Sequence, residues 1–264
     1  MKKLILLSFF AVAALGATQG RLIAVDSSRA LYEIDMNTGA KTMISTVSSN
    51  ASTTAGLAYD RTSSTMYLTS SGNDSLYTLN TVTGAATLIG AYGNSALVMH
   101  GLEYDDSTGI LYGISSHDNG LYNINKITGV ATLIGTSGLS SFSNLGYNST
   151  TNTMYSTNSG TDSIYSMNRA TGATTLIGAL GGPTNPNGVA YNWNNQKMYL
   201  VDNSTDNLYT INLATGAATV IGSTGSANLL GLAYVNAVPE PATMAALGLG
   251  VAALLPPTTK GLRR

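Results

Sequence analysis

An internal repeat of about 44 residues runs through most of this 264-residue chain. A Thr-Gly dipeptide recurs at the same place in each unit, and its glycines follow one another at intervals of 45, 45, 43 and 44 residues. Three series of tyrosines keep the same period, and this strict spacing predicts that they pack between neighbouring units. The body of the protein is therefore five copies of one structural unit. The glycines are Gly39, Gly84, Gly129, Gly172 and Gly216; the tyrosines are Tyr32, Tyr77, Tyr122, Tyr165 and Tyr209, then Tyr59, Tyr104, Tyr147, Tyr191 and Tyr234, then Tyr67, Tyr112, Tyr155 and Tyr199.

Each unit contains four short runs that are typical of β-strands. In the second unit these runs are Gly56–Tyr59, Met66–Thr69, Leu76–Leu79 and Ala86–Ile89. Polar, glycine-containing turns separate them, and the Thr-Gly turn needs a residue with positive φ, which glycine adopts without steric cost. No run reaches the ~10 residues that a helix needs, so a helical solenoid is excluded.

Four strands per unit of this length indicate a β-propeller, in which each unit is one blade. The first unit begins with Leu22–Val25, which aligns with the second strand of the later units. The missing first strand occurs at the other end of the body, as Gly231–Tyr234. We therefore expect an all-β, five-bladed propeller whose C-terminal strand completes the first blade and so leaves no free inner edge. An open β-solenoid remains the alternative.

The repeat also resembles a known group of bacterial propellers. The first unit reads Leu31-Tyr32-Glu33-Ile34-Asp35 and then Thr38-Gly39. This pattern is similar to that of the NHL and YncE-like repeat proteins. The resemblance implies the propeller fold and nothing about activity, because propellers serve in binding, scaffolding and catalysis alike.

The first 17 residues have the three-part form of a secretory signal peptide. Met1–Lys3 is positively charged, Leu4–Leu15 is an apolar run of 12 residues, and the small residues Gly16 and Ala17 suit cleavage. Such a run is too short to span a bilayer core of ~30 Å. We therefore assign residues 1–17 to a signal peptide and residues 18–236 to the propeller.

Residues 237–264 carry a second targeting pattern. Val238, Pro239, Glu240 and Pro241 precede an apolar stretch, Ala242–Leu255, and the chain closes on a basic end. A helix of that stretch reaches only ~21 Å, which is short for a permanent membrane anchor. The segment resembles the PEP-CTERM sorting signal of Gram-negative bacteria. That resemblance implies transient insertion in the inner membrane, cleavage by an exosortase, and a link to exopolysaccharide or biofilm; a plain C-terminal anchor is the alternative. The terminal arginines of this signal are Arg263 and Arg264.

The composition excludes several classes of function. Only 9% of the residues are charged and no basic patch is visible, which argues against a nucleic-acid partner. The chain contains no cysteine, so it has neither disulfides nor a thiolate metal site. No catalytic constellation stands out, and we expect a non-enzymatic binding or structural protein of the cell surface or matrix that needs no metal or other cofactor. Its partner would be an extracellular polysaccharide or another surface protein.

Candidate sites are few. The loops before each first strand and between the second and third strands should share one face of the propeller, and they include the least repetitive segments. His100, Glu103 and His117 could form a metal site there, which gives the alternative function, an extracytoplasmic metal-dependent hydrolase or lactonase. Four recurring aspartates could hold calcium, although bonding within turns accounts for them equally. Trp193, in a turn on the opposite face, and Phe142 lie outside the tyrosine series. The four aspartates are Asp74, Asp118, Asp162 and Asp206.

Overall fold

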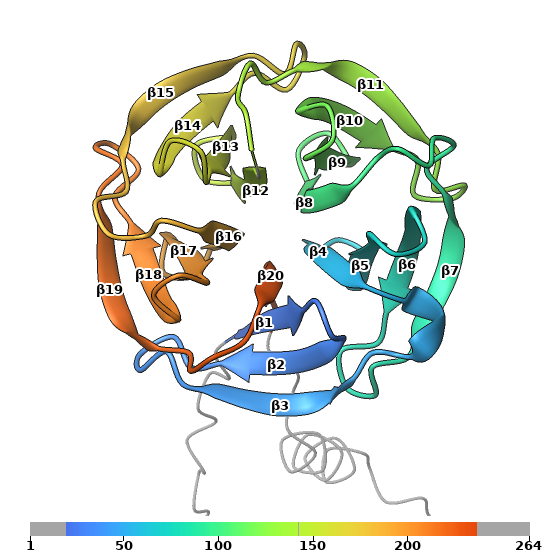
Figure 1. The fold of residues 1–264 in the computed structure, drawn as a ribbon, viewed down its shortest axis with the longest axis horizontal. Coiled ribbons are helices and arrows are strands. Elements are labelled where there is room, and N and C mark those ends of the chain that lie inside the picture. The colour runs from blue at the N-terminus through green and yellow to red at the C-terminus, as the bar shows by residue number, and fades with distance from the viewer. Residues whose placement is uncertain (1–19, 142, 237–264) are drawn as a thin grey trace, which may run out of the picture. The chain divides into compact units, whose positions relative to one another are not determined.

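The computed structural model describes residues 20–141 and 143–236, which form a β-propeller of five four-stranded antiparallel sheets (Figure 1). We name the five sheets blades A to E, and the strands of each blade are given in order from the central axis outwards. Blade A consists of β20 (Leu229–Val235), β1 (Arg21–Asp26), β2 (Ala30–Ile34) and β3 (Lys41–Thr46). Blade B consists of β4 (Thr54–Asp60), β5 (Thr65–Ser70), β6 (Ser75–Leu79) and β7 (Ala86–Ala91). Blade C consists of β8 (Met99–Asp105), β9 (Ile110–Ser115), β10 (Gly120–Ile124) and β11 (Ala131–Thr136).

Blade D consists of β12 (Ser143–Asn148), β13 (Thr153–Asn158), β14 (Ser163–Met167) and β15 (Thr174–Ala179). Blade E consists of β16 (Pro186–Asn192), β17 (Lys197–Asp202), β18 (Asn207–Ile211) and β19 (Ala218–Ser223). The predicted fold is confirmed, and the strands extend by up to two residues at either end of the predicted runs. The only helical element of the described residues is a short 3-10 turn, Ser49–Ala51. The predicted signal peptide and sorting segment lie outside the described residues.

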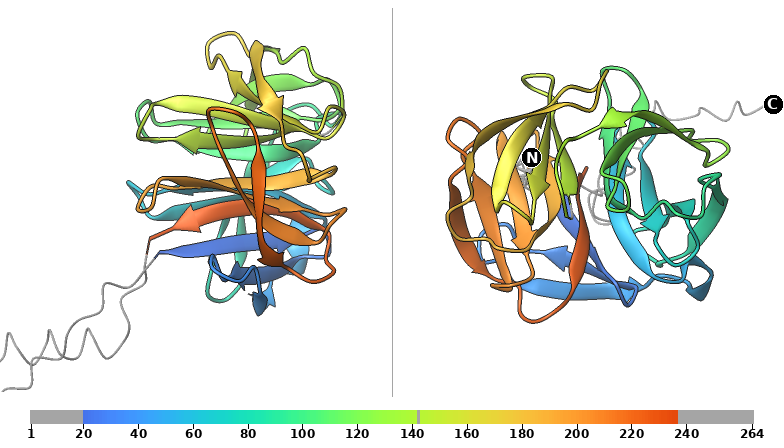
Figure 2. Two further views of the ribbon diagram at one scale, coloured as in Figure 1. Left: turned by 90° about the vertical axis from the view of Figure 1, so that its left-hand side faces the viewer. Right: turned by 45° about the horizontal axis from the view of Figure 1, so that its top comes forward.

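The C-terminal strand closes the ring as predicted. β20 pairs antiparallel with β1, and Arg21 lies opposite Val235. All seven residues of β20 are buried, and the strand also packs against the inner strands β4 and β16 of the two neighbouring blades. The first and last strands of the propeller are therefore neighbours, and the chain enters β1 and leaves β20 at the same end of the molecule (Figure 2).

The inner strands approach one another so closely that some positions admit only glycine. A Cβ placed on Gly56 of β4 would lie 2.6 Å from the carbonyl oxygen of His100 on β8. A Cβ on Gly188 of β16 would lie 2.6 Å from the Cβ of Leu232 on β20. These contacts bring five inner strands around one narrow axis, with the apolar cores lying between successive blades.

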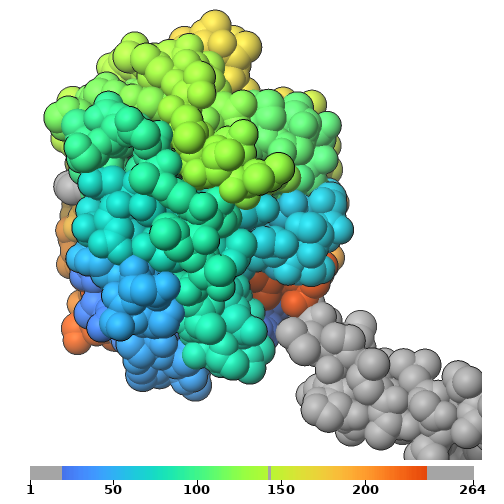
Figure 3. Space-filling view, turned by 90° about the vertical axis from the view of Figure 1, so that its right-hand side faces the viewer, coloured from blue at the N-terminus to red at the C-terminus, as the bar shows by residue number. Residues whose placement is uncertain are grey.

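The Thr-Gly turns join neighbouring blades at the rim. All five glycines adopt φ values between 75° and 84°, as the hairpin prediction requires. At Gly129 of blade C, an added Cβ would overlap the carbonyl oxygen of Gly90 on β7, the outer strand of blade B. The turn of one blade thus rests on the outer strand of the blade before it. Figure 3 shows this rim from the side, where residues of blades A, B and C adjoin.

Replacing Gly129 by alanine is expected to destabilise the propeller more than the same change at Gly138. Both glycines have positive φ, 79° and 71°, which costs an L-residue ~1 kcal/mol. Only Gly129 meets another blade, whereas a Cβ on Gly138 meets nothing within 4 Å. Overpacking at the rim should add ~2 kcal/mol for Gly129→Ala. Urea unfolding of both variants measures the difference, and equal losses would contradict contact between blades at this turn.

Candidate functional site

The axis of the propeller opens at the end where the inner strands terminate, and we call this opening the channel mouth. A cavity of about 30 Å³ lies there. Its wall contains one tyrosine from each blade, and these five form one of the three series recognised in the sequence. They are Tyr59, Tyr104, Tyr147, Tyr191 and Tyr234.

These tyrosines pack between the blades, as their strict period predicts, and the hydroxyls of two of them bond to a neighbouring blade. The Tyr191 hydroxyl of blade E lies 2.8 Å from Thr150 Oγ1 of blade D. The Tyr234 hydroxyl of blade A accepts a hydrogen bond of 2.8 Å from Asn194 Nδ2 of blade E. Their hydroxyls are thus engaged at the rim of the mouth, while their rings form the wall of the cavity.

Trp193 closes the mouth from the turn that follows β16. Its ring lies edge-on to Tyr234, with the ring centroids 4.6 Å apart, and nearly parallel to Tyr59 of blade B at 6.5 Å. Arg61 of blade B lies over the Trp193 ring, with its guanidinium carbon 5.3 Å from the centroid, and forms an ion pair with Asp106 of blade C. Side chains of blades E, B and C therefore meet over the cavity. The prediction that Trp193 lies in a turn on this end is confirmed.

Glu103, on the inner strand β8, lines the inner end of the cavity. Its Oε1 accepts a hydrogen bond of 2.9 Å from the backbone N–H of Tyr104, and its Oε2 one of 3.0 Å from the N–H of Tyr147. These donors lie on the inner strands of blades C and D, so the carboxyl group spans two blades. Burial raises the pKa of Glu103 to about 8, against the lowering effect of the two N–H donors.

Two junctions between blades at this end are held by ion pairs. Lys126, in the Thr-Gly turn of blade C, lies 3.5 Å from the Asp60 carboxylate at the end of β4. Arg169, in the equivalent turn of blade D, pairs with Asp105 at the end of β8. Burial alone would raise the pKa of Asp60, but hydrogen bonds from Thr62 and its neighbour lower it to about 2.

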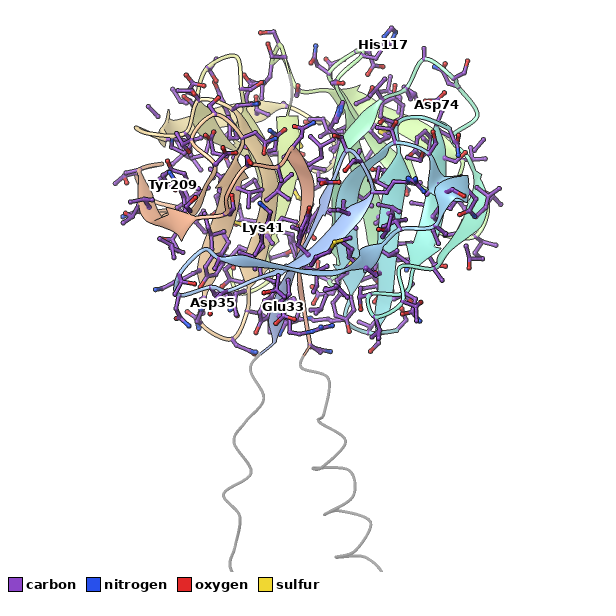
Figure 4. All side chains as sticks on the ribbon, turned by 60° about the horizontal axis from the view of Figure 1, so that its bottom comes forward. Glu33, Asp35, Lys41, Asp74, His117 and Tyr209 are labelled. Atoms are coloured by element: carbon purple, nitrogen blue, oxygen red, sulfur yellow. The ribbon has the colours of Figure 1, made fainter. Side chains whose placement is uncertain are left out.

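The three residues of the predicted alternative metal site do not converge. His100 is the second residue of β8, and its Nδ1 lies 3.0 Å from Ser116 Oγ; burial lowers its pKa to about 4. His117 is exposed on a loop at the end opposite the channel mouth, as Figure 4 shows. Glu103 faces the mouth instead. Within residues 20–141 and 143–236, no group of three or more His, Asp or Glu side chains could hold a metal ion.

The recurring aspartates stabilise turns. Asp74, Asp162 and Asp206 have positive φ, between 47° and 51°, in the turns between second and third strands. Asp118 lies in the equivalent turn of blade C, where its Oδ1 accepts a hydrogen bond of 3.1 Å from the N–H of Gly120 and the neighbouring Asn119 has positive φ.

The predicted loop face is confirmed, since its two sets of loops are hydrogen-bonded to each other, for example through Ser71 N–H and Thr53 O at 2.9 Å. The loops and strand ends of this face carry six aspartates, of which Asp26 and Asp202 are buried, together with Arg29, and Lys41 Nζ donates hydrogen bonds to the loop between β19 and β20. Most of the other basic residues lie at the channel-mouth end of the propeller. The aspartates of the loop face are Asp26, Asp74, Asp118, Asp162, Asp202 and Asp206.

The remaining predicted residues lie outside the described part of the chain. They are Phe142 and the sorting-signal residues Val238, Pro239, Glu240, Pro241, Arg263 and Arg264. In the part that is described, no helix has the length and apolar character needed to cross a membrane.

No family model and no curated protein matches this chain. Solved structures do resemble it. A chain of a nidogen/laminin complex aligns with a TM-score of 0.57 and 17% identity, over 85% of this chain and 87% of that one. A Bacteroides thetaiotaomicron protein of unknown function gives 0.61 and 17%, over 85% and 64%. Virginiamycin B lyase from Staphylococcus aureus gives 0.51 and 14%, over 83% and 78%. At such low identity these likenesses establish the fold alone: the chain is a β-propeller similar in structure to those of nidogen and virginiamycin B lyase.

Proposed function

We propose that this protein is an exported binding or structural propeller of the cell surface or extracellular matrix, sorted through a PEP-CTERM-like tail. The observation that carries the proposal is the tail sequence, in which Val238–Pro241 precedes a short apolar stretch and a basic end. A stretch of this length suits a segment that pauses in the inner membrane and is then removed by an exosortase-type enzyme.

The propeller supports this function through the position of its ends. Arg21 and Val235 lie opposite each other in adjacent strands, so both targeting segments join the propeller at the channel-mouth end. The loop face lies at the opposite end, where Figure 4 shows Asp74 and His117. That face lies at the opposite end of the propeller from Arg21 and Val235, and it is the face that we expect to bind the partner.

The charge of the loop face narrows the partner. Four of its aspartates are at least partly exposed, and they outnumber the basic residues Arg29 and Lys41 there, so an acidic polysaccharide would be repelled. A neutral or amino-bearing polysaccharide, or a surface protein with a basic patch, fits this face better. Binding of this kind needs no catalytic group, and the proposal is accordingly a non-enzymatic one.

In a host with an exosortase, the mature protein is expected to lose everything from about Pro241 onward and to leave the membrane fraction. Changing Pro239, Glu240 and Pro241 together to alanine should leave export intact and hold the uncut chain in the inner membrane, because the N-terminal signal is unchanged. Cell fractionation followed by intact-mass measurement tests both outcomes.

The matched control changes Thr258 and Thr259 to alanine, which alters the same tail outside the Pro-Glu-Pro motif. This variant should be processed like the parent chain. Surface-located protein that still ends in Arg264 would refute the sorting proposal and favour a plain C-terminal anchor.

A further inference from the structure

Glu103 is a half-buried acidic group that forms no ion pair among the described residues, since Arg61, the basic residue that lines the same cavity, is paired with Asp106. The ion pairs among residues 20–141 and 143–236 use other carboxylates, those of Glu33, Asp60, Asp105 and Asp106. Two backbone N–H groups bind the Glu103 carboxyl, but they carry no net charge. Burying a carboxylate without a counter-ion is unfavourable, so the cavity above it is a position where a cation would be stabilised.

The repeat shows that the fold itself does not require an acid here. The equivalent inner-strand positions of the other four blades hold only small side chains, which line the axis without charge. Glu103 is thus a departure from the repeat at one position of one blade, and it places an ionisable carboxyl group at the mouth. The four equivalent residues are Ala58, Gly146, Ala190 and Ala233.

The walls of the cavity suit a cation as well. Tyr59, Trp193 and Tyr234 surround the opening, and aromatic faces attract positive charge. The protein's own cations already use neighbouring rings in this way: Lys126 Nζ lies 4.5 Å from the centroid of Tyr104, and the Arg61 guanidinium covers Trp193. The cavity combines this aromatic surface with the carboxylate below it.

Size and coordination decide which cation fits. About 30 Å³ admits one or two particles the size of water, since one water needs ~10–15 Å³. A sugar ring is far too large, and calcium needs ~6–8 oxygen ligands, more than Glu103 and the Arg61-paired Asp106 can supply in so small a space. An ammonium group is of suitable size, donates hydrogen bonds to a carboxylate and is attracted by aromatic rings.

We propose that the channel mouth binds an ammonium group, with Glu103 as its counter-ion and with Tyr59, Trp193 and Tyr234 as its aromatic walls. The group would be ammonium itself or the end of a primary amine that enters past Trp193. This site lies at the opposite end from the acidic loop face and does not depend on the sorting function proposed above.

The single tryptophan of the chain makes the site directly observable, because all tryptophan fluorescence comes from Trp193 at the mouth. The full-length protein in mild detergent is titrated with ammonium chloride at constant ionic strength. We expect a saturable change in emission. Glu103→Gln should weaken binding at least tenfold, whereas Glu33→Gln, which neutralises a more exposed acid on the same end of the molecule, should leave it unchanged.

Further titrations identify the source and the size limit. If the site admits the end of a primary amine, methylammonium should bind. If ammonium binds and methylammonium does not, the ligand is the free ammonium ion. Tetramethylammonium and calcium should give no saturable response. If Glu103→Gln melts well below the parent, Tyr59→Leu replaces it and should also weaken binding. The proposal is overturned if ammonium gives no saturable response, if a folded Glu103→Gln variant titrates like the parent, or if tetramethylammonium binds as well as ammonium.

Discussion

A chain that ends at Asn228 is expected to be unfolded or aggregated, whereas a chain that ends at Asn236 should melt cooperatively. The shorter chain lacks β20, whose residues are all buried. Leu229, Leu232 and Tyr234 belong to the core between blades A and E, and Val235 to the core between blades A and B. At ~2 kcal/mol for each large apolar side chain, the loss approaches the ~5–15 kcal/mol that stabilises a typical domain.

The loop that delivers β20 is itself fastened to blade A. Lys41 Nζ of β3 donates hydrogen bonds to the carbonyl oxygens of Thr224, Gly225 and Ser226, at 2.5, 2.9 and 3.2 Å. Both chains of the comparison contain all the residues of these contacts, so the difference between them isolates the strand. Size-exclusion chromatography and thermal unfolding followed by circular dichroism measure it. Similar melting of the two chains would contradict ring closure by β20.

Arg169→Leu is expected to cost ~3 kcal/mol, and adding Asp105→Asn should restore most of that loss. Asp105 is fully buried. Its own burial would raise its pKa, but hydrogen bonds from Ser107 and Thr108 and the Arg169 guanidinium lower it below the ordinary value. Without Arg169 the ionised carboxylate is left buried and unpaired, which is strongly destabilising.

The repeat itself supplies the model for the double variant. At the junction between blades D and E, the equivalent positions hold Asn148 and Leu213. At the junction between blades E and A, Asn192 Nδ2 lies 3.3 Å from Met36 Sδ. Where the turn of the next blade carries a basic residue, the inner strand ends in an aspartate. Where that turn carries an apolar residue, as at these two junctions, the inner strand ends in an asparagine.

Asn at position 105 can still accept the turn hydrogen bond, as Asn148 accepts that of Thr150 at 2.9 Å. Urea unfolding of the parent, both single variants and the double variant forms a complete cycle. If the double variant is as unstable as Arg169→Leu, the idea that an Asn–Leu pair can replace the Asp–Arg pair at this junction is wrong.

The features that recur in every unit could be predicted from the sequence. The spacing of Thr-Gly and tyrosine gave the number of blades, and the displaced strand at Gly231–Tyr234 gave the closure. Such predictions succeed because each depends on short segments whose alternation and turn residues have a local physical cause.

The channel mouth could not be predicted, although each of its residues was visible. Tyr59, Asp106 and Trp193 come from different blades and lie far apart in the sequence, and each was interpreted within its own unit. Their meeting depends on the number of blades and on the narrow axis left by the inner strands. Glu103 was noticed as the one acid among small residues, but it was grouped with His100 and His117 because they are close in sequence.

The amino-acid pattern thus decided the fold, because a repeat imposes the same short-range preferences on every blade. The closed ring decided the site. Closure brings the unrepeated residues of different blades to one axis, and there the enclosed carboxylate of Glu103 faces the rings of Tyr59 and Trp193. The distance between side chains of different blades depends on the curvature of the whole ring, and the sequence of a single unit does not determine that curvature.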